Sequence, residues 1–141
     1  MTLVNARAAF ETAVNSAVTA ADPTVSVIFD NMPFTTPGKT KKYVMVTINF
    51  DQSTIQPHGA AIDQYFGTVQ CGIFTPRNKG SAVAAAIAES VIDGLTSVNA
   101  AGYVDTYSVK PRVNQIEGPT AVTEENNSHF VSVVSCRFTA V

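Results

Sequence analysis

Residues 43–50 alternate strictly between apolar and more polar side chains, and no other feature of the sequence constrains the fold as strongly. One face of this segment carries Val44, Val46, Ile48 and Phe50, and the other carries Tyr43, Met45, Thr47 and Asn49. Successive side chains of a β-strand point to opposite faces, so the pattern predicts a strand with one face packed on a core. Such a strand needs neighbouring strands and a second layer to cover its apolar face.

Four further segments have strand composition: residues 25–29, 64–75, 102–109 and 129–139. In the segment 64–75 the inward side chains are Tyr65, Val69, Cys71 and Ile73. Gly67 and Gly72 in the same segment permit a β-bulge or a close approach of another chain segment. Residues 51–61 and 112–128 are rich in polar residues, proline and glycine, and they are predicted to be loops.

Two segments have the 3.6-residue apolar spacing of amphipathic helices. In residues 2–20 the stripe consists of Leu3, Phe10, Val14 and Val18, filled in by Ala6 and Ala17. In residues 81–95 it consists of Ala84, Ile87, Ala88, Val91, Ile92 and Leu95. The element order αβββαββ predicts an α+β fold in which an antiparallel or mixed sheet of about five strands is packed on one side by two helices. Residues 1–141 are expected to form a single domain.

Charged residues are scarce in this chain. They make up 14% of its 141 residues, against about 25% in typical soluble domains, while 45% are apolar. This balance favours a surface that partner subunits cover in part. The formal net charge of −2 argues against a direct nucleic-acid ligand. Lys39, Lys41 and Lys42 form the one basic spot, which we interpret first as a solvated turn.

The sequence carries no secretory signal pattern at its start and no uninterrupted apolar span of about 18 residues. We therefore expect a cytosol-like compartment and no contact with a membrane. Cys71 and Cys136 both lie in predicted strands among apolar neighbours. This placement predicts two buried free thiols that act as small apolar side chains.

The residue patterns of catalytic and metal sites are missing from the sequence. His58 and His129 are the two histidines, and neither lies in a cluster of cysteines or carboxylates at metal-ligand spacing. There is no Gly-x-Ser-x-Gly turn, and Lys79-Gly80-Ser81 lacks the upstream glycine of a phosphate-binding loop. We expect no enzyme activity and no cofactor.

Several sequence segments, taken in order, carry a resemblance to a known family. An N-terminal helix is followed by Phe29-Asp30-Asn31-Met32-Pro33-Phe34, by the strand 43–48, by the stretch 67–80 that ends Phe74-Thr75-Pro76-Arg77-Asn78-Lys79-Gly80, and by an alanine-rich helix. In this order the chain resembles, over nearly its whole length, the tail-terminator family of tailed bacteriophages. It departs from the family at Pro37, where the second loop proline is displaced, and at Ser128-His129-Phe130, where family members often carry an aromatic pair.

The resemblance implies a structural virion protein without catalytic chemistry. It implies a homo-oligomeric ring, typically of six copies, at the head-proximal end of the tail tube. Such a ring stops tube polymerisation and presents a surface for head joining. The expected partners are copies of the same chain, the tail tube protein and a head-completion or connector protein, first in the host cytoplasm and then in the virion.

Long loops are expected to carry the contacts in such a ring, because strand side chains are divided between core and surface. The candidate interface residues are Pro33, Phe34, Lys41, Lys42, Pro57, His58, Glu124 and Glu125. In this hypothesis Phe34 is an apolar anchor, and Lys41 and Lys42 face Glu124 and Glu125 of a neighbouring copy. The alternative for Phe34 is that it packs on the core of its own chain.

Two other functions stay open at the level of sequence. The chain could be a head-tail connector or a subunit that stacks into tubes instead of capping them. From a different class, it could be a cytosolic small-molecule binding domain or enzyme, which would require a pocket with converging polar groups.

Overall fold

Five strands form one mixed sheet in the order β1-β2-β3-β5-β4 in the computed structural model, which describes residues 3–29, 41–55, 62–76, 82–100, 111–122 and 129–140. The elements are α1 (Leu3–Ala21), β1 (Ser26–Phe29), β2 (Tyr43–Ile55), β3 (Ile62–Pro76), α2 (Ala82–Ala100), β4 (Pro111–Val122) and β5 (His129–Ala140). The predicted α+β class and the order αβββαββ are confirmed.

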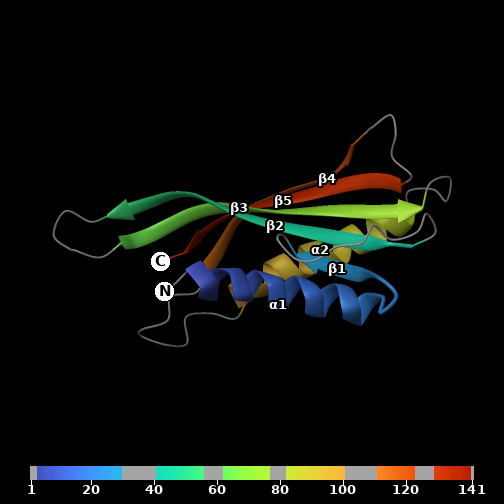
Figure 1. Ribbon diagram of the computed structural model, residues 1–141, viewed down its shortest axis with the longest axis horizontal. Coiled ribbons are helices and arrows are strands. Elements are labelled where there is room, and N and C mark those ends of the chain that lie inside the picture. The colour runs from blue at the N-terminus through green and yellow to red at the C-terminus, as the bar shows by residue number, and fades with distance from the viewer. Residues whose placement is uncertain are drawn as a thin grey trace.

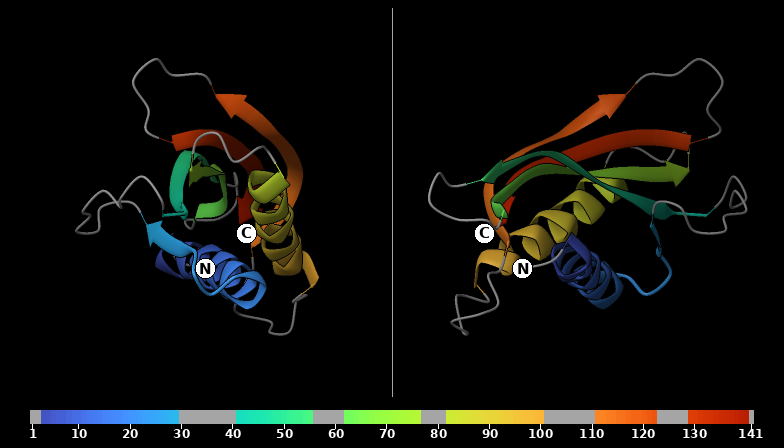
Figure 2. Two further views of the ribbon diagram at one scale, coloured as in Figure 1. Left: turned by 90° about the vertical axis from the view of Figure 1, so that its right-hand side faces the viewer. Right: turned by 60° about the vertical axis from the view of Figure 1, so that its left-hand side comes forward.

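The sheet and the helices form two layers. β1 pairs with β2 in parallel, whereas the β2–β3, β3–β5 and β5–β4 pairs are antiparallel. Both helices lie on the same side of the sheet (Figure 1), and the sheet bends over them (Figure 2). We call the helix-covered side of the sheet the inner face and the opposite side the outer face.

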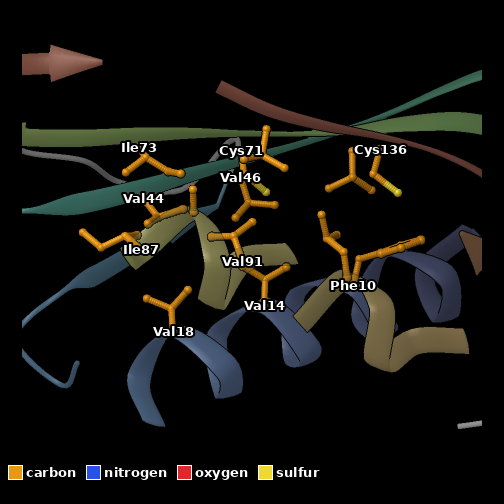
Figure 3. Packing of buried hydrophobic residues seen from close by; sticks show 14 of the residues in the cluster. Phe10, Val14, Val18, Val44, Val46, Cys71, Ile73, Ile87, Val91 and Cys136 are labelled. Atoms are coloured by element: carbon orange, nitrogen blue, oxygen red, sulfur yellow. The ribbon is translucent and has the colours of Figure 1, made fainter. Parts of the chain in front are cut away.

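The core fills the space between the helices and the inner face. Figure 3 shows side chains of β2, β3 and β5 pointing toward those of α1 and α2. The fully buried side chains include Phe10, Val14, Val44, Val46, Val69, Ile73, Val91, Leu95, Val134 and Phe138. Phe138 stacks at a tilt on Phe10, with ring centroids 4.7 Å apart, and so links β5 to α1. Each such side chain contributes about 1.5–3 kcal/mol through removal of apolar surface from water.

The two helices approach closely at Gly94 of α2. A Cβ atom at this position would lie 2.9 Å from the Ala13 carbonyl oxygen and 3.0 Å from the Cβ of Ala17, both on α1. Only glycine fits at such a distance, because real Cβ contacts are longer. The helix layer is therefore packed almost backbone to backbone at this crossing.

The apolar periodicities of the sequence correctly identify the core-facing side chains. Val44, Val46 and Ile48 are buried in β2, as are Val69, Cys71 and Ile73 in β3. Phe10, Val14 and Val18 are buried in α1. The stripe of α2 also points inward, although α2 extends past the predicted end at residue 95 to Ala100, since Val98 continues the stripe and is buried.

The predicted loop at 51–61 is wrong for its first part, because β2 continues to Ile55. The register of β2 against β3 shifts between Phe50 and Gln52, opposite Gly67. A bulge of this kind adds one residue and breaks the two-residue alternation, so the strand pattern cannot be followed through residues 50–52 in the sequence. The rest of the predicted loop, residues 56–61, lies outside the described residues.

The predicted loop at 112–128 is wrong for residues 112–122, because residues 111–122 form β4, the edge strand beside β5. Residues 123–128 of the predicted loop lie outside the described residues. Register shifts between Val113 and Gln115 and between Glu117 and Thr120 disrupt its alternation, which explains why the sequence pattern is typical of a loop. The predicted strand at 102–109 lies outside the described residues.

Candidate assembly surfaces

The structure describes two of the eight predicted interface residues. Lys41 and Lys42 precede β2. Pro33, Phe34, Pro57, His58, Glu124 and Glu125 lie outside the described residues, so their roles stay predictions.

Lys42 makes an ion pair within its own chain. Its ammonium group donates to Asp22 Oδ2 at 2.6 Å, and both side chains are partly exposed. The hydrogen bond from Lys42, followed by those from the Thr24 hydroxyl and amide, lowers the pKa of Asp22 from 3.8 to about 2. The pair ties the loop after α1 to the start of β2. Lys41 is exposed and has no ion-pair partner among the described residues.

The main chain at Lys41 is held by an aromatic cluster on the outer face. His129 Nε2 donates to the Lys41 carbonyl oxygen at 3.0 Å. The ring of Tyr43 stacks on Phe74 with centroids 4.4 Å apart, and His129 meets Tyr43 edge-on at 5.3 Å. Tyr43 and His129 are both buried, at 5% and 3% exposure. This cluster fixes the point from which the Lys41 side chain extends into solvent.

An apolar groove of about 380 Å³ lies where the end of α1, the start of β1 and the start of α2 meet. Its walls include Val18, Val25 and Ile87, and the Asp22–Lys42 pair closes one side. Val83 borders the groove and is 37% exposed, the highest value for a large apolar side chain in the described part of the chain. The groove offers apolar contact area with few polar groups.

A second, more polar depression of about 480 Å³ involves the other end of the sheet. Asp51, Thr68, Gln115 and Arg137 line it, together with Phe66, Gly67 and Phe138. The Thr68 hydroxyl donates to Asp51 at 3.3 Å, whereas the Arg137 guanidinium is exposed. A Cβ at residue 67 would collide with the Asn49 carbonyl oxygen and lie 2.6 Å from the Phe138 ring, so glycine is required for β2 and Phe138 to come this close.

Among the described strands, the edges of the sheet are only partly paired. β1 has four residues and pairs with Tyr43 to Val46, so among the described strands none follows β2 on that side from Thr47 to Ile55. At the opposite edge, β4 pairs with β5. Unpaired strand edges are templates for pairing with another chain, which is why proteins usually protect them.

Arg7 of α1 protects one carbonyl on the open part of β2. Its Nη2 donates to the Ile48 carbonyl oxygen at 3.1 Å, and its Nη1 lies 3.6 Å from Glu11. The Lys42 carbonyl accepts from the Ser26 amide of β1, and carbonyls of alternate residues point to the same side, so the Ile48 carbonyl points toward the open edge.

The two cysteine side chains that the structure describes serve packing. Cys71 and Cys136 are free and buried, as predicted. Burial raises the pKa of both thiols to about 12, so both are protonated and poorly nucleophilic at neutral pH. Within the described ranges, no group of three or more His, Cys, Asp or Glu side chains is arranged to hold a metal ion. No described helix is long and apolar enough to span a bilayer.

No protein-family model and no curated protein matches the chain. Among solved structures, one without a functional name matches with a TM-score of 0.68 at 20% sequence identity, covering 100% of this chain and 96% of its own. This likeness shows that the fold exists in another protein. The bacteriophage SPP1 gp17 protein also matches, with a TM-score of 0.46 at 17% identity, covering 93% of this chain and 88% of its own.

Sequence reasoning missed the aromatic cluster and the open edges. Tyr43 falls on the polar side of the alternation, and its position opposite Phe74 depends on the β2–β3 register. The open edge depends on the shortness of β1, which follows from the short run of strand-forming residues Val27, Ile28 and Phe29. That run indicates a short strand, but the sequence does not identify the strand with which it pairs.

Proposed function

We propose that this chain is a structural virion protein of the tail-terminator type. Copies of the chain assemble into a ring of about six subunits at the head-proximal end of a phage tail tube. The ring ends tube growth and provides the surface on which the head is joined. The proposal rests on the order of sequence motifs from the N-terminal helix to Gly80 and on the low charge content of the chain.

The observation that carries the proposal is the incomplete cover of the sheet. Among the described strands, β1 pairs with only the first four residues of β2 along one edge of the sheet, and β4 forms the opposite edge. A domain built in this way has main-chain groups available for contact with further copies. The packing roles of Cys71, Cys136 and His129 support a function without catalysis, because the chemistry these residues could perform is sequestered.

The test is the absolute mass of the purified protein across a concentration series, measured by light scattering after size exclusion, with negative-stain imaging of each species. We expect a discrete ring of about six subunits that grows no further. Open tubes would favour a stacking tube subunit instead. A monomer at every concentration would contradict self-assembly and favour the small-molecule binding alternative.

The predicted ionic contacts of the ring are tested best at Lys41. Reversal of Lys42 would also break its pair with Asp22, whereas Lys41 has no ion-pair partner in the described part of the chain. We expect Lys41→Glu to weaken ring formation in sedimentation, and Lys41→Gln to weaken it less. An unchanged sedimentation profile for Lys41→Glu would remove Lys41 from the interface.

A further inference from the structure

The direction of the edge strands determines how two copies can meet. β2, β3, β5 and β4 are antiparallel from each strand to the next, so β4 runs opposite to β2. Rotation about an axis along the strands leaves strand directions unchanged. When copies are related by such a rotation, β4 of one copy and β2 of the next therefore meet antiparallel, which is the more stable pairing.

The register places matching parts of the two edges at the same height along the strands. Gln115 pairs with Arg137, Arg137 with Thr68, and Thr68 with Asn49. By the same route Glu117 is level with Thr47, through Ser135 and Gln70. Gln115–Glu117 of β4 is therefore level with Thr47–Asn49 of β2, and no rise along the axis is needed for these segments to meet in a ring.

The covered and irregular parts of the two edges are also level with each other. Thr120 is level with Met45, through Val133 and Gly72, and β1 already pairs with β2 at Met45. Between Glu117 and Thr120 the register of β4 against β5 shifts. Thus the register of β4 against β5 is irregular at the level where β2 already pairs with β1. It is regular at Gln115–Glu117, which is the level where β2 has no described strand beside it.

The hydrogen bond of Arg7 is compatible with a further strand. A carbonyl oxygen has two lone pairs and can accept two hydrogen bonds. The Ile48 carbonyl, which accepts from Arg7 Nη2, can therefore also accept from an amide of a neighbouring strand. In the single copy, Arg7 keeps this edge carbonyl satisfied.

We propose that Gln115–Glu117 of β4 in one copy pairs antiparallel with Thr47–Asn49 of β2 in the next copy, so that the sheets of successive copies join around the ring. The inference rests on the proposed function, because it names the strands through which that ring closes. The contact uses different edges of the two copies and is heterologous, which allows a closed ring. Pairing of β2 with β2 or of β4 with β4 would instead be isologous and would stop at a dimer.

Disulfide trapping tests this pairing. Asn49 and Gln115 are exposed, and residues opposite each other in an antiparallel pair have Cα atoms about 4.5–5.5 Å apart, within the range that a disulfide bridges. We expect the double variant Asn49→Cys/Gln115→Cys, oxidised after assembly, to give a ladder of covalent oligomers up to the ring size on a denaturing gel. The native cysteines are buried and do not contribute to the ladder.

The matched control moves one cysteine along β4. Thr120 is also exposed, but it lies beyond the register shift and is level with Met45 instead of Asn49. We expect Asn49→Cys/Thr120→Cys, oxidised in the same way, to give no ladder. Each single variant alone should give no covalent dimer, whereas a mixture of the two single variants should give dimers and no larger species.

The possible results separate this inference from the proposed function. A ring of unchanged mass without cross-links in Asn49→Cys/Gln115→Cys overturns the edge pairing and leaves the ring intact. Covalent dimers from either single variant show isologous pairing and also overturn it. A wild-type protein that stays monomeric at every concentration contradicts the proposed function, and the edge contact with it.

Discussion

The inner and outer faces of the sheet are built from the same strands but have different chemistry. The inner face presents mainly aliphatic side chains such as Val44, Val69 and Val134 to the helices. The outer face has an aromatic and histidine cluster at one end and polar side chains such as Gln70 and Arg137 at the other. The comparison teaches that the aliphatic core is concentrated on one face, whereas the exposed polar side chains lie on the other face.

The largest expected effect is the loss of an inner-face aromatic ring. Phe138→Ala removes a side chain that is 1% exposed and packs on Phe10 and Phe50, so it should lower the free energy of unfolding by about 3–5 kcal/mol. Urea denaturation followed by circular dichroism measures this change. The adjacent outer-face variant Arg137→Ala should stay within about 0.5 kcal/mol of the wild type. Equal losses at both positions would contradict the division between the faces.

The close approach at Gly67 should give the next largest effect. Gly67→Ala places a methyl group against the Asn49 carbonyl oxygen and the Phe138 ring, which forces backbone shifts that cost about 1–3 kcal/mol. Gly72→Ala on the same strand is the control, since its Cβ would meet a side-chain atom of Phe74 at 3.1 Å, which can move. Thermal unfolding of both variants checks the prediction, and a Gly72→Ala variant as unstable as Gly67→Ala would contradict it.

A smaller effect is expected from the outer-face cluster. Tyr43→Leu removes the stack on Phe74 and the edge contact with His129, which should cost about 1 kcal/mol beyond the change in buried area. Tyr43→Phe keeps the ring and should retain most of this stability. The two variants are compared by chemical denaturation. A loss at Tyr43→Leu as large as that at Phe138→Ala would show that the outer face carries a second core.

The smallest effect concerns the Asp22–Lys42 pair at the end of the sheet. Because the pKa of Asp22 is lowered from 3.8 to about 2, the pair stabilises the fold above pH 3.8 and loses its contribution as the pH falls toward 2. Asp22→Asn should therefore flatten the stability profile between pH 4 and 2. Lys42→Met, which removes the largest cause, should raise the pKa of Asp22 toward 3.8 in an NMR titration. An unchanged titration would show that Lys42 does not hold the carboxylate.

The residues that face the core could be predicted from the sequence, because burial of one side of a strand or helix produces a regular spacing of apolar residues. The alternation at Val44, Val46 and Ile48 and the helical stripe at Phe10, Val14 and Val18 each follow from local geometry. The strand β4 could not be predicted, because two register shifts and Pro119 disrupt its period. An edge strand tolerates register shifts and proline because only one of its edges forms hydrogen bonds with a neighbouring strand.

The candidate assembly surfaces were harder to predict than the fold. Lys41 and Lys42 were found as a basic spot, but the ion pair of Lys42 with Asp22 joins residues far apart in the sequence. Gln115 and Asn49 lie at the same level along the strands because of the combined registers of three strand pairs, β2–β3, β3–β5 and β5–β4. Strand register is set by the hydrophobic pattern and by turn geometry, and the register shifts in β2 and β4 interrupt that pattern.

The position of β5 inside the sheet has a consequence for the timing of synthesis. β5 is the last described strand, yet it lies between β3 and β4 and pairs with both. A nascent chain that has not yet released residues 129–140 from the ribosome cannot attach β4 to the sheet, because β4 has no other strand partner among the described elements. The edge that β4 forms therefore arises only after residues 129–140 have emerged and folded, so this edge is not available to other chains before that point.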